Sequence, residues 1–186
     1  MTVNATTENP DTRDLAAPPT GERADLLTML AKHRHFLRFT TRDLSDEQAG
    51  LRTTASELCL GGLIKHVSAT ERGWVDFILE GPSAMGDFDD MTEEDFARRA
   101  DEFRMLPGET LAGVLDAYAE VARRTDQLVA TLPDLDATQP LPKAPWFQDT
   151  HRSVRQVFLH IIAETAQHAG HADIIRESLD GAKTMG

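Results

Sequence analysis

The stretch SVRQVFLHIIAETAQHAGHADIIRESLDG (153–181) carries the clearest helical pattern in the chain. Its apolar residues recur at helical spacing from Val154 to Leu179, and Gly181 follows where a helix C-cap is expected. A helix turns by about 100° per residue, so polar side chains spaced three or four apart share one stripe. Here that stripe consists of His160, Glu164, His168 and His171. Because it borders the apolar face, it can point ligands into the interior of a helix bundle.

Three stretches upstream show the same helical periodicity. We expect a helix over 21–43, a second from Thr54 or Ser56 to Gly81, and a third between Gly108 and Leu132. Glu57, three residues after Thr54, makes a candidate capping box for the second helix. No stretch alternates in a way that predicts a strand. Four long amphipathic helices joined by one long connection therefore predict an all-α bundle.

The connections differ in composition. Residues 82–107 are acidic and are expected to hold a short helix over Thr92–Arg104, and Ser45 opens a turn or short helix before the second long helix. Residues 133–150 contain four prolines and are expected to form a loop that covers an apolar surface. Residues 1–19 lack apolar periodicity, which predicts a mobile N-terminal leader before a single domain over 20–183.

The composition narrows the classes of function. The chain of 186 residues has 31 acidic and 19 basic side chains, for a formal charge of −12. Such a surface repels phosphate groups, so nucleic acid and membrane surfaces are poor partners and a small-molecule substrate is expected. The single Cys59 cannot form an internal disulfide and is expected to be a buried thiol. With no secretion signal and no membrane-spanning run, a cytoplasmic protein is expected. A homodimer through helix faces stays open.

Two residues of the last helix predict part of a metal site. Glu164 and His168, at i and i+4, are close enough to chelate one ion. His66 is the candidate third ligand, because it interrupts an apolar stretch of the second helix and Gly73 leaves room nearby. Two histidines, one carboxylate and an open position suit a catalytic zinc or another first-row metal. The alternatives are that His66 is a core histidine and that Glu164 and His168 are an ordinary helix-face pair.

The remaining candidates surround this site. His171 is expected to orient the ligands by hydrogen bonding or to line the pocket, with a surface position as the alternative. His160 is a spare ligand or a core residue. Trp146 is expected to form a lid or a wall over one end of the bundle, whereas His33 and His35 are expected on a helix surface.

Two segments also resemble a known family. SELCLGGLIKHVSATERGW (56–74) and the last-helix stretch resemble the DinB/YfiT-like superfamily, and more narrowly an actinobacterial branch of unknown function related to the mini-circle proteins. GERADLLTMLAKHR (21–34) fits that branch, whereas 82–150 is only loosely similar. The resemblance implies an up-down four-helix bundle with a long connection and a short extra helix between the second and third long helices. The N-terminal domain of mycothiol-dependent maleylpyruvate isomerases uses His, Glu and His, which by position implies His66, Glu164 and His168 as ligands.

The resemblance also implies an activity. Family members of known activity are thiol transferases or isomerases. They present a low-molecular-weight thiol to an electrophile, and a metal activates the sulfur as a thiolate. We therefore expect a metal-dependent S-transferase with one divalent ion (zinc first, with nickel, iron or manganese as alternatives) and with mycothiol as a candidate thiol. Metal-assisted hydrolysis at the same site is one alternative. A stress-related metal-binding protein without catalysis is the other.

Overall fold

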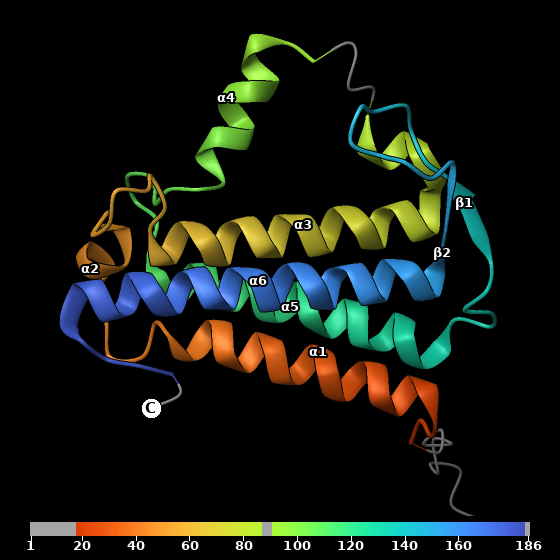
Figure 1. Cartoon of the computed structure of the whole chain (residues 1–186), viewed down its shortest axis with the longest axis horizontal. Coiled ribbons are helices and arrows are strands. Elements are labelled where there is room, and N and C mark those ends of the chain that lie inside the picture. Colours follow the sequence, from red (N-terminus) through yellow and green to blue (C-terminus); the bar gives the residue numbers. More distant parts are fainter. Residues whose placement is uncertain (1–17, 87–90, 185–186) are drawn as a thin grey trace, which may run out of the picture.

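The computed structural model describes residues 18–86 and 91–184, and four long helices form its body (Figure 1). They are α1 (Glu22–Phe39), α3 (Leu60–Glu80), α5 (Leu111–Thr131) and α6 (Val154–Asp180). α6 packs against α1 and α3, and α3 also packs against α5. The predicted all-α bundle is confirmed. The leader expected over 1–19 lies, apart from its last two residues, outside the described residues. No helix in the described ranges is long and apolar enough to cross a membrane.

A long connection between α3 and α5 sets the direction of the helices. It contains the short helix α4 (Glu93–Asp101) and returns the chain to the end of the bundle where α3 begins (Figure 1). α3 and α5 therefore run parallel. Lys65 near the start of α3 pairs with Glu109 just before α5, and Asp76 near the end of α3 pairs with Arg124 of α5, each at 2.7 Å. α1 and α6 run antiparallel to both.

Local hydrogen bonds and backbone conformation define where the long helices begin and end. α6 begins at a capping box, in which the Ser153 hydroxyl accepts from the backbone N–H of Gln156 and the Gln156 side chain accepts from that of Ser153. It ends at Gly181, whose φ of 78° is left-handed, as expected for a C-cap. α1 ends at Phe39, four residues before its predicted end, and Thr40 turns its hydroxyl back to the Leu37 carbonyl.

The predicted start of the second long helix is wrong. α3 begins at Leu60, because the hydroxyls of Thr54 and Ser56 accept the backbone N–H groups of Ser56 and Leu58, each at 3.2 Å, and so stabilise turns instead of a helix end. The N-cap of α3 is Cys59, whose sulfur accepts from the Gly62 N–H at 3.4 Å. Cys59 is 1% exposed, so its predicted burial is confirmed.

Short elements between the long helices complete the fold. α2 (Asp46–Gly50) follows Ser45 as expected, and η1 (Gly81–Met85) follows α3. Two strands, β1 (Thr138–Pro140) and β2 (His151–Ser153), pair antiparallel, although no strand was predicted. With three residues each, they are too short for an alternating pattern, and their backbones pair across the closed loop between them. α4 is shorter than the predicted helix over Thr92–Arg104.

The core has two apolar clusters separated by a polar layer. One cluster lies around Phe77 and Phe158 and the other around Leu63 and Tyr118. Between them each long helix contributes a buried polar residue: Arg34, Glu71, Thr125 and Thr165. The Arg34 guanidinium donates to both carboxylate oxygens of Glu71, at 2.5 and 3.2 Å, and to Asp126 at 2.7 Å. This polar layer was not predicted from the sequence.

Candidate metal centre

The antiparallel helices α3 and α6 bring three candidate ligands together. His66 of α3 and Glu164 and His168 of α6 each offer a ligand atom, and these atoms all lie within 4.8 Å of one another. Nε2 of His168 lies 3.6 Å from Oε2 of Glu164. The rings of His66 and His168 meet edge to face with centroids 4.9 Å apart. The three residues that the spacing singled out are therefore neighbours in space.

The donor set fits a divalent first-row metal ion. The hydrogen bond from His168 holds the pKa of the Glu164 carboxyl below its usual value, against the opposing effect of burial, and the nearby histidines add to the lowering. This carboxylate is therefore ionised and can neutralise part of the charge of a cation. Nδ1 of His66 is buried and makes no hydrogen bond with residues 18–86 or 91–184. Two imidazoles and one carboxylate leave at least one coordination position for a substrate.

Two further histidines contact the candidate ligands. Nδ1 of His171 lies 3.4 Å from Nδ1 of His168, on the side of the ring opposite to Glu164. His171 is therefore placed to orient His168. Nε2 of His160 lies 3.7 Å from Oε1 of Glu164, and its ring packs edge to face on Trp74 at 4.8 Å. Burial lowers the pKa of His160, and the nearby Arg152 adds to this effect.

The connection after α4 supplies two contacts that the sequence analysis missed. The ring of Phe103 stacks on His66 with centroids 4.0 Å apart, and Oε2 of Glu102 lies 3.5 Å from Nδ1 of His66. Both residues lie about 36 positions away in sequence, at the end of the short helix that was predicted over Thr92–Arg104. No local signal could have identified them.

A cavity of about 480 Å³ lies beside the candidate ligands. A Cβ added at Gly73 would meet nothing within 4 Å, so the predicted room at this glycine is confirmed. Trp146, 57% exposed, forms part of a wall and not a closed lid. The side chains that line the cavity include His66, Trp74, Met85, Arg99, Glu102, Trp146, Phe147, His160 and Glu164. An apolar or aromatic group could therefore bind next to the ligands.

Two predicted surface histidines lie away from this site. His33 and His35 belong to α1, and each packs its ring near Phe36, with centroids 6.4 and 6.0 Å apart. Neither lines the cavity or joins the three-residue cluster.

Comparison with known proteins gives one family. A family model described as mycothiol-S-transferase matches residues 25–181, which span the bundle from α1 to α6. A search of curated proteins gives no match.

Proposed function

The chain belongs to the mycothiol-S-transferase family, within the DinB/YfiT-like superfamily, and from this membership we propose that it is a metal-dependent thiol S-transferase. Membership of this family supports the proposal that the chain transfers a low-molecular-weight thiol, with mycothiol as the first candidate. The observation that carries the proposed metal dependence is the convergence of His66, Glu164 and His168 within 4.8 Å.

In this proposal these three residues hold one divalent ion. Zinc is the first candidate, and nickel, iron and manganese are alternatives, because imidazole and carboxylate ligands suit all four and metal availability decides among them. When bound, such an ion lowers the pKa of a coordinated thiol and so supplies a thiolate nucleophile at neutral pH.

The surrounding residues keep the ligands in place. His171 contacts Nδ1 of His168 and leaves Nε2 facing Glu164. Phe103 covers one face of the His66 ring. Replacing a residue that orients a metal ligand typically lowers metal affinity or activity by about 10- to 100-fold. The four-helix frame and the connection after α4 therefore both contribute to the proposed site.

The cavity beside the candidate ligands is the proposed binding place for the electrophile. Trp74, Trp146 and Phe147 line it together with His66 and Glu164. An electrophile with an apolar body would lie against these rings, with its reactive carbon beside the open coordination position. Such packing orients the two reactants and excludes water that would compete with the thiol.

Thiol transfer to monochlorobimane tests this function. Untagged, zinc-loaded protein is supplied with mycothiol, and the reaction forms a C–S bond, breaks the C–Cl bond and releases chloride and the thiol proton to solvent. We expect turnover by the native chain and by His33→Ala, and its loss in His66→Ala and Glu164→Ala. Turnover that persists in both ligand variants would contradict the proposal. Hydrolysis of an ester without any thiol would support the hydrolase alternative instead.

A further inference from the structure

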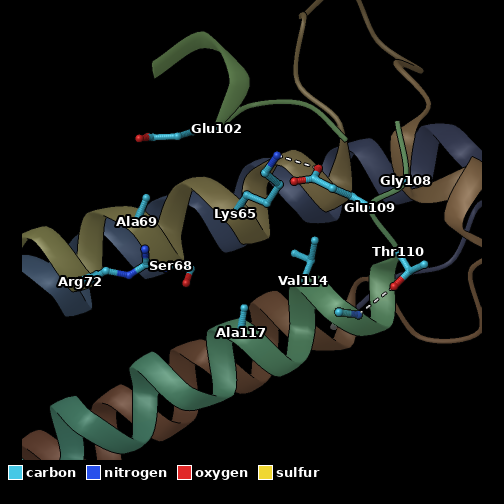
Figure 2. A pocket seen from close by; sticks show the side chains of 11 residues that line it. Lys65, Ser68, Ala69, Arg72, Glu102, Gly108, Glu109, Thr110, Val114 and Ala117 are labelled. Carbon is cyan, nitrogen blue, oxygen red and sulfur yellow. Dashed lines mark hydrogen bonds and ion pairs between the residues drawn. The ribbon is translucent and has the colours of Figure 1, made fainter. Parts of the chain in front are cut away.

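A second cavity lies next to the metal-site cavity. It measures about 520 Å³ and lies between α3 and α5, with Glu102 above it (Figure 2). Ala69 and Glu102 line both cavities. The two spaces are therefore adjacent on the surface of α3, separated by the small side chain of Ala69. A ligand longer than either cavity could occupy both.

Two polar side chains in this α3–α5 cavity have no hydrogen-bond partner among the described residues. Ser68 is 4% exposed, and its hydroxyl makes no hydrogen bond. Figure 2 shows this hydroxyl pointing from α3 toward α5. The Arg72 guanidinium makes no hydrogen bond or ion pair with the described part of the chain. A buried hydroxyl without a partner costs free energy that a ligand could recover, and the Arg72 side chain is exposed, so both groups are available to a ligand.

Lys65, by contrast, is already used. Its ammonium donates to the carbonyls of Asp101 and Arg104, at 3.0 and 2.9 Å, and to the Glu109 carboxylate at 2.7 Å. An ammonium has three hydrogen atoms to donate, so Lys65 has none left for a ligand. Its role is to hold the connection against α3.

The remaining groups favour a neutral ligand that carries hydroxyls. Arg72 can only donate hydrogen bonds, the Glu102 carboxylate can only accept them, and Ser68 can do both. A hydroxyl-bearing ligand can match all three. Glu109 is already paired with Lys65, and the remaining charged groups, Arg72 and Glu102, carry opposite charges, so the cavity favours a ligand without net charge. Val114 and Ala117 of α5 give the cavity an apolar floor on which the carbon skeleton of such a ligand can rest.

We propose that the α3–α5 cavity binds the neutral, hydroxyl-bearing body of the thiol substrate, while the sulfur reaches past Ala69 to the metal centre. This inference rests on the proposed function, because it assigns a thiol to that site. It divides the two cavities between the two reactants. The thiol body contacts Ser68 and Arg72, and the electrophile lies against Trp74 and Trp146.

Binding measurements with two thiols test this division. The dissociation constants of mycothiol and of free cysteine, which lacks the body, are measured by calorimetry on zinc-loaded protein. In Ser68→Ala and Arg72→Gln we expect mycothiol to bind about tenfold more weakly, the effect of one lost hydrogen bond to a charged or buried group. Ala117→Phe, which fills the cavity from α5, should have a larger effect. Cysteine binding should change by less than about twofold in all three variants.

The controls separate this inference from the proposed function. Arg38→Gln removes an arginine of α1 that does not line the cavity and should leave both dissociation constants unchanged. Ser68→Ala removes a buried hydroxyl that has no partner among the described residues, so its melting temperature should be no lower than that of the native chain. Equal weakening of mycothiol and cysteine, unchanged mycothiol binding, or no mycothiol binding by the native protein would overturn the inference. If the variants bound mycothiol more weakly but cysteine as before, and the native protein catalysed no thiol transfer, only the proposed function would be overturned.

Discussion

The Phe103 ring stacks on the imidazole of His66, with centroids 4.0 Å apart and planes inclined by 25°. The two residues belong to different parts of the chain, and Lys65 fixes the contact by binding the carbonyls of Asp101 and Arg104 on either side of Phe103. The orientation of one candidate ligand therefore depends on a connection outside the four-helix frame.

Replacing Phe103 should weaken metal binding. In Phe103→Ala the His66 ring loses the surface that covers one face, and the freed rotamers must be ordered again when an ion binds. We expect about tenfold weaker zinc affinity, the size seen for residues that orient metal ligands. Competition with a chromogenic chelator measures the zinc affinity. Phe96→Ala, at a 60% exposed phenylalanine of α4, is the matched control. Equal affinities in the two variants would contradict the role of Phe103.

A methyl group at Gly62 should displace the same connection. A Cβ at Gly62 would lie 2.0 Å from the Phe103 carbonyl oxygen, whereas one at Gly170 of α6 would meet nothing within 4 Å. Gly62→Ala should therefore destabilise the fold, and Gly170→Ala should stabilise it by up to about 1 kcal/mol through helix propensity. Urea unfolding of both variants gives the comparison. A stable Gly62→Ala protein with native zinc affinity would show that the close contact is unimportant.

The buried ion pair of the polar layer should be sensitive to loss of one partner. The side chains of Arg34 and Glu71 are 7% and 0% exposed. Arg34→Met leaves the Glu71 carboxylate without its counter-charge in the core, and we expect a loss of about 3–5 kcal/mol in the free energy of unfolding. The double variant Arg34→Met/Glu71→Leu should recover most of it. If the double variant were as unstable as the single one, packing and not the uncompensated charge would be responsible.

Glu109 should contribute to stability only above acidic pH. Burial alone would raise its pKa, but hydrogen bonds from Lys65 and the Leu106 N–H lower the pKa below the ordinary value of 4.5. The folded state therefore favours the ionised form, so the contribution is complete above about pH 4.5 and is lost as the pH falls through the lowered value. Urea unfolding of Glu109→Gln should show a deficit at pH 7 that shrinks toward pH 3. Glu120 forms an exposed ion pair with Arg123, so Glu120→Gln should show little loss in the free energy of unfolding at either pH.

Local patterns were enough to predict most of the frame. Residues of one helix face follow from spacing alone, so the stripe of His160, Glu164, His168 and His171 was visible before the fold. His66 was identifiable because it interrupts an apolar stretch. The start of α3 was misplaced because Thr54 and Ser56 have the hydroxyls of a helix cap but use them in turns.

The features that the sequence analysis missed depend on contacts between distant segments. Glu102 and Phe103 reach His66 only because Lys65 holds their connection against α3. The Arg34–Glu71 pair joins two helices at positions that look like exposed charges in a helical pattern. The close approach of the Phe103 backbone to Gly62 also joins two distant segments. None of these pairings leaves a periodic or motif-like trace.

Metal content is the most direct test of the central claim, that His66, Glu164 and His168 form one metal site. Elemental analysis is made on protein purified without a His tag, for the native chain, His66→Ala, Glu164→Ala and the control His33→Ala. The account predicts about one zinc, nickel, iron or manganese ion per chain in the native and control proteins and loss of the ion in both ligand variants. A native protein without metal, whose melting temperature does not rise when zinc or nickel is added, would contradict it.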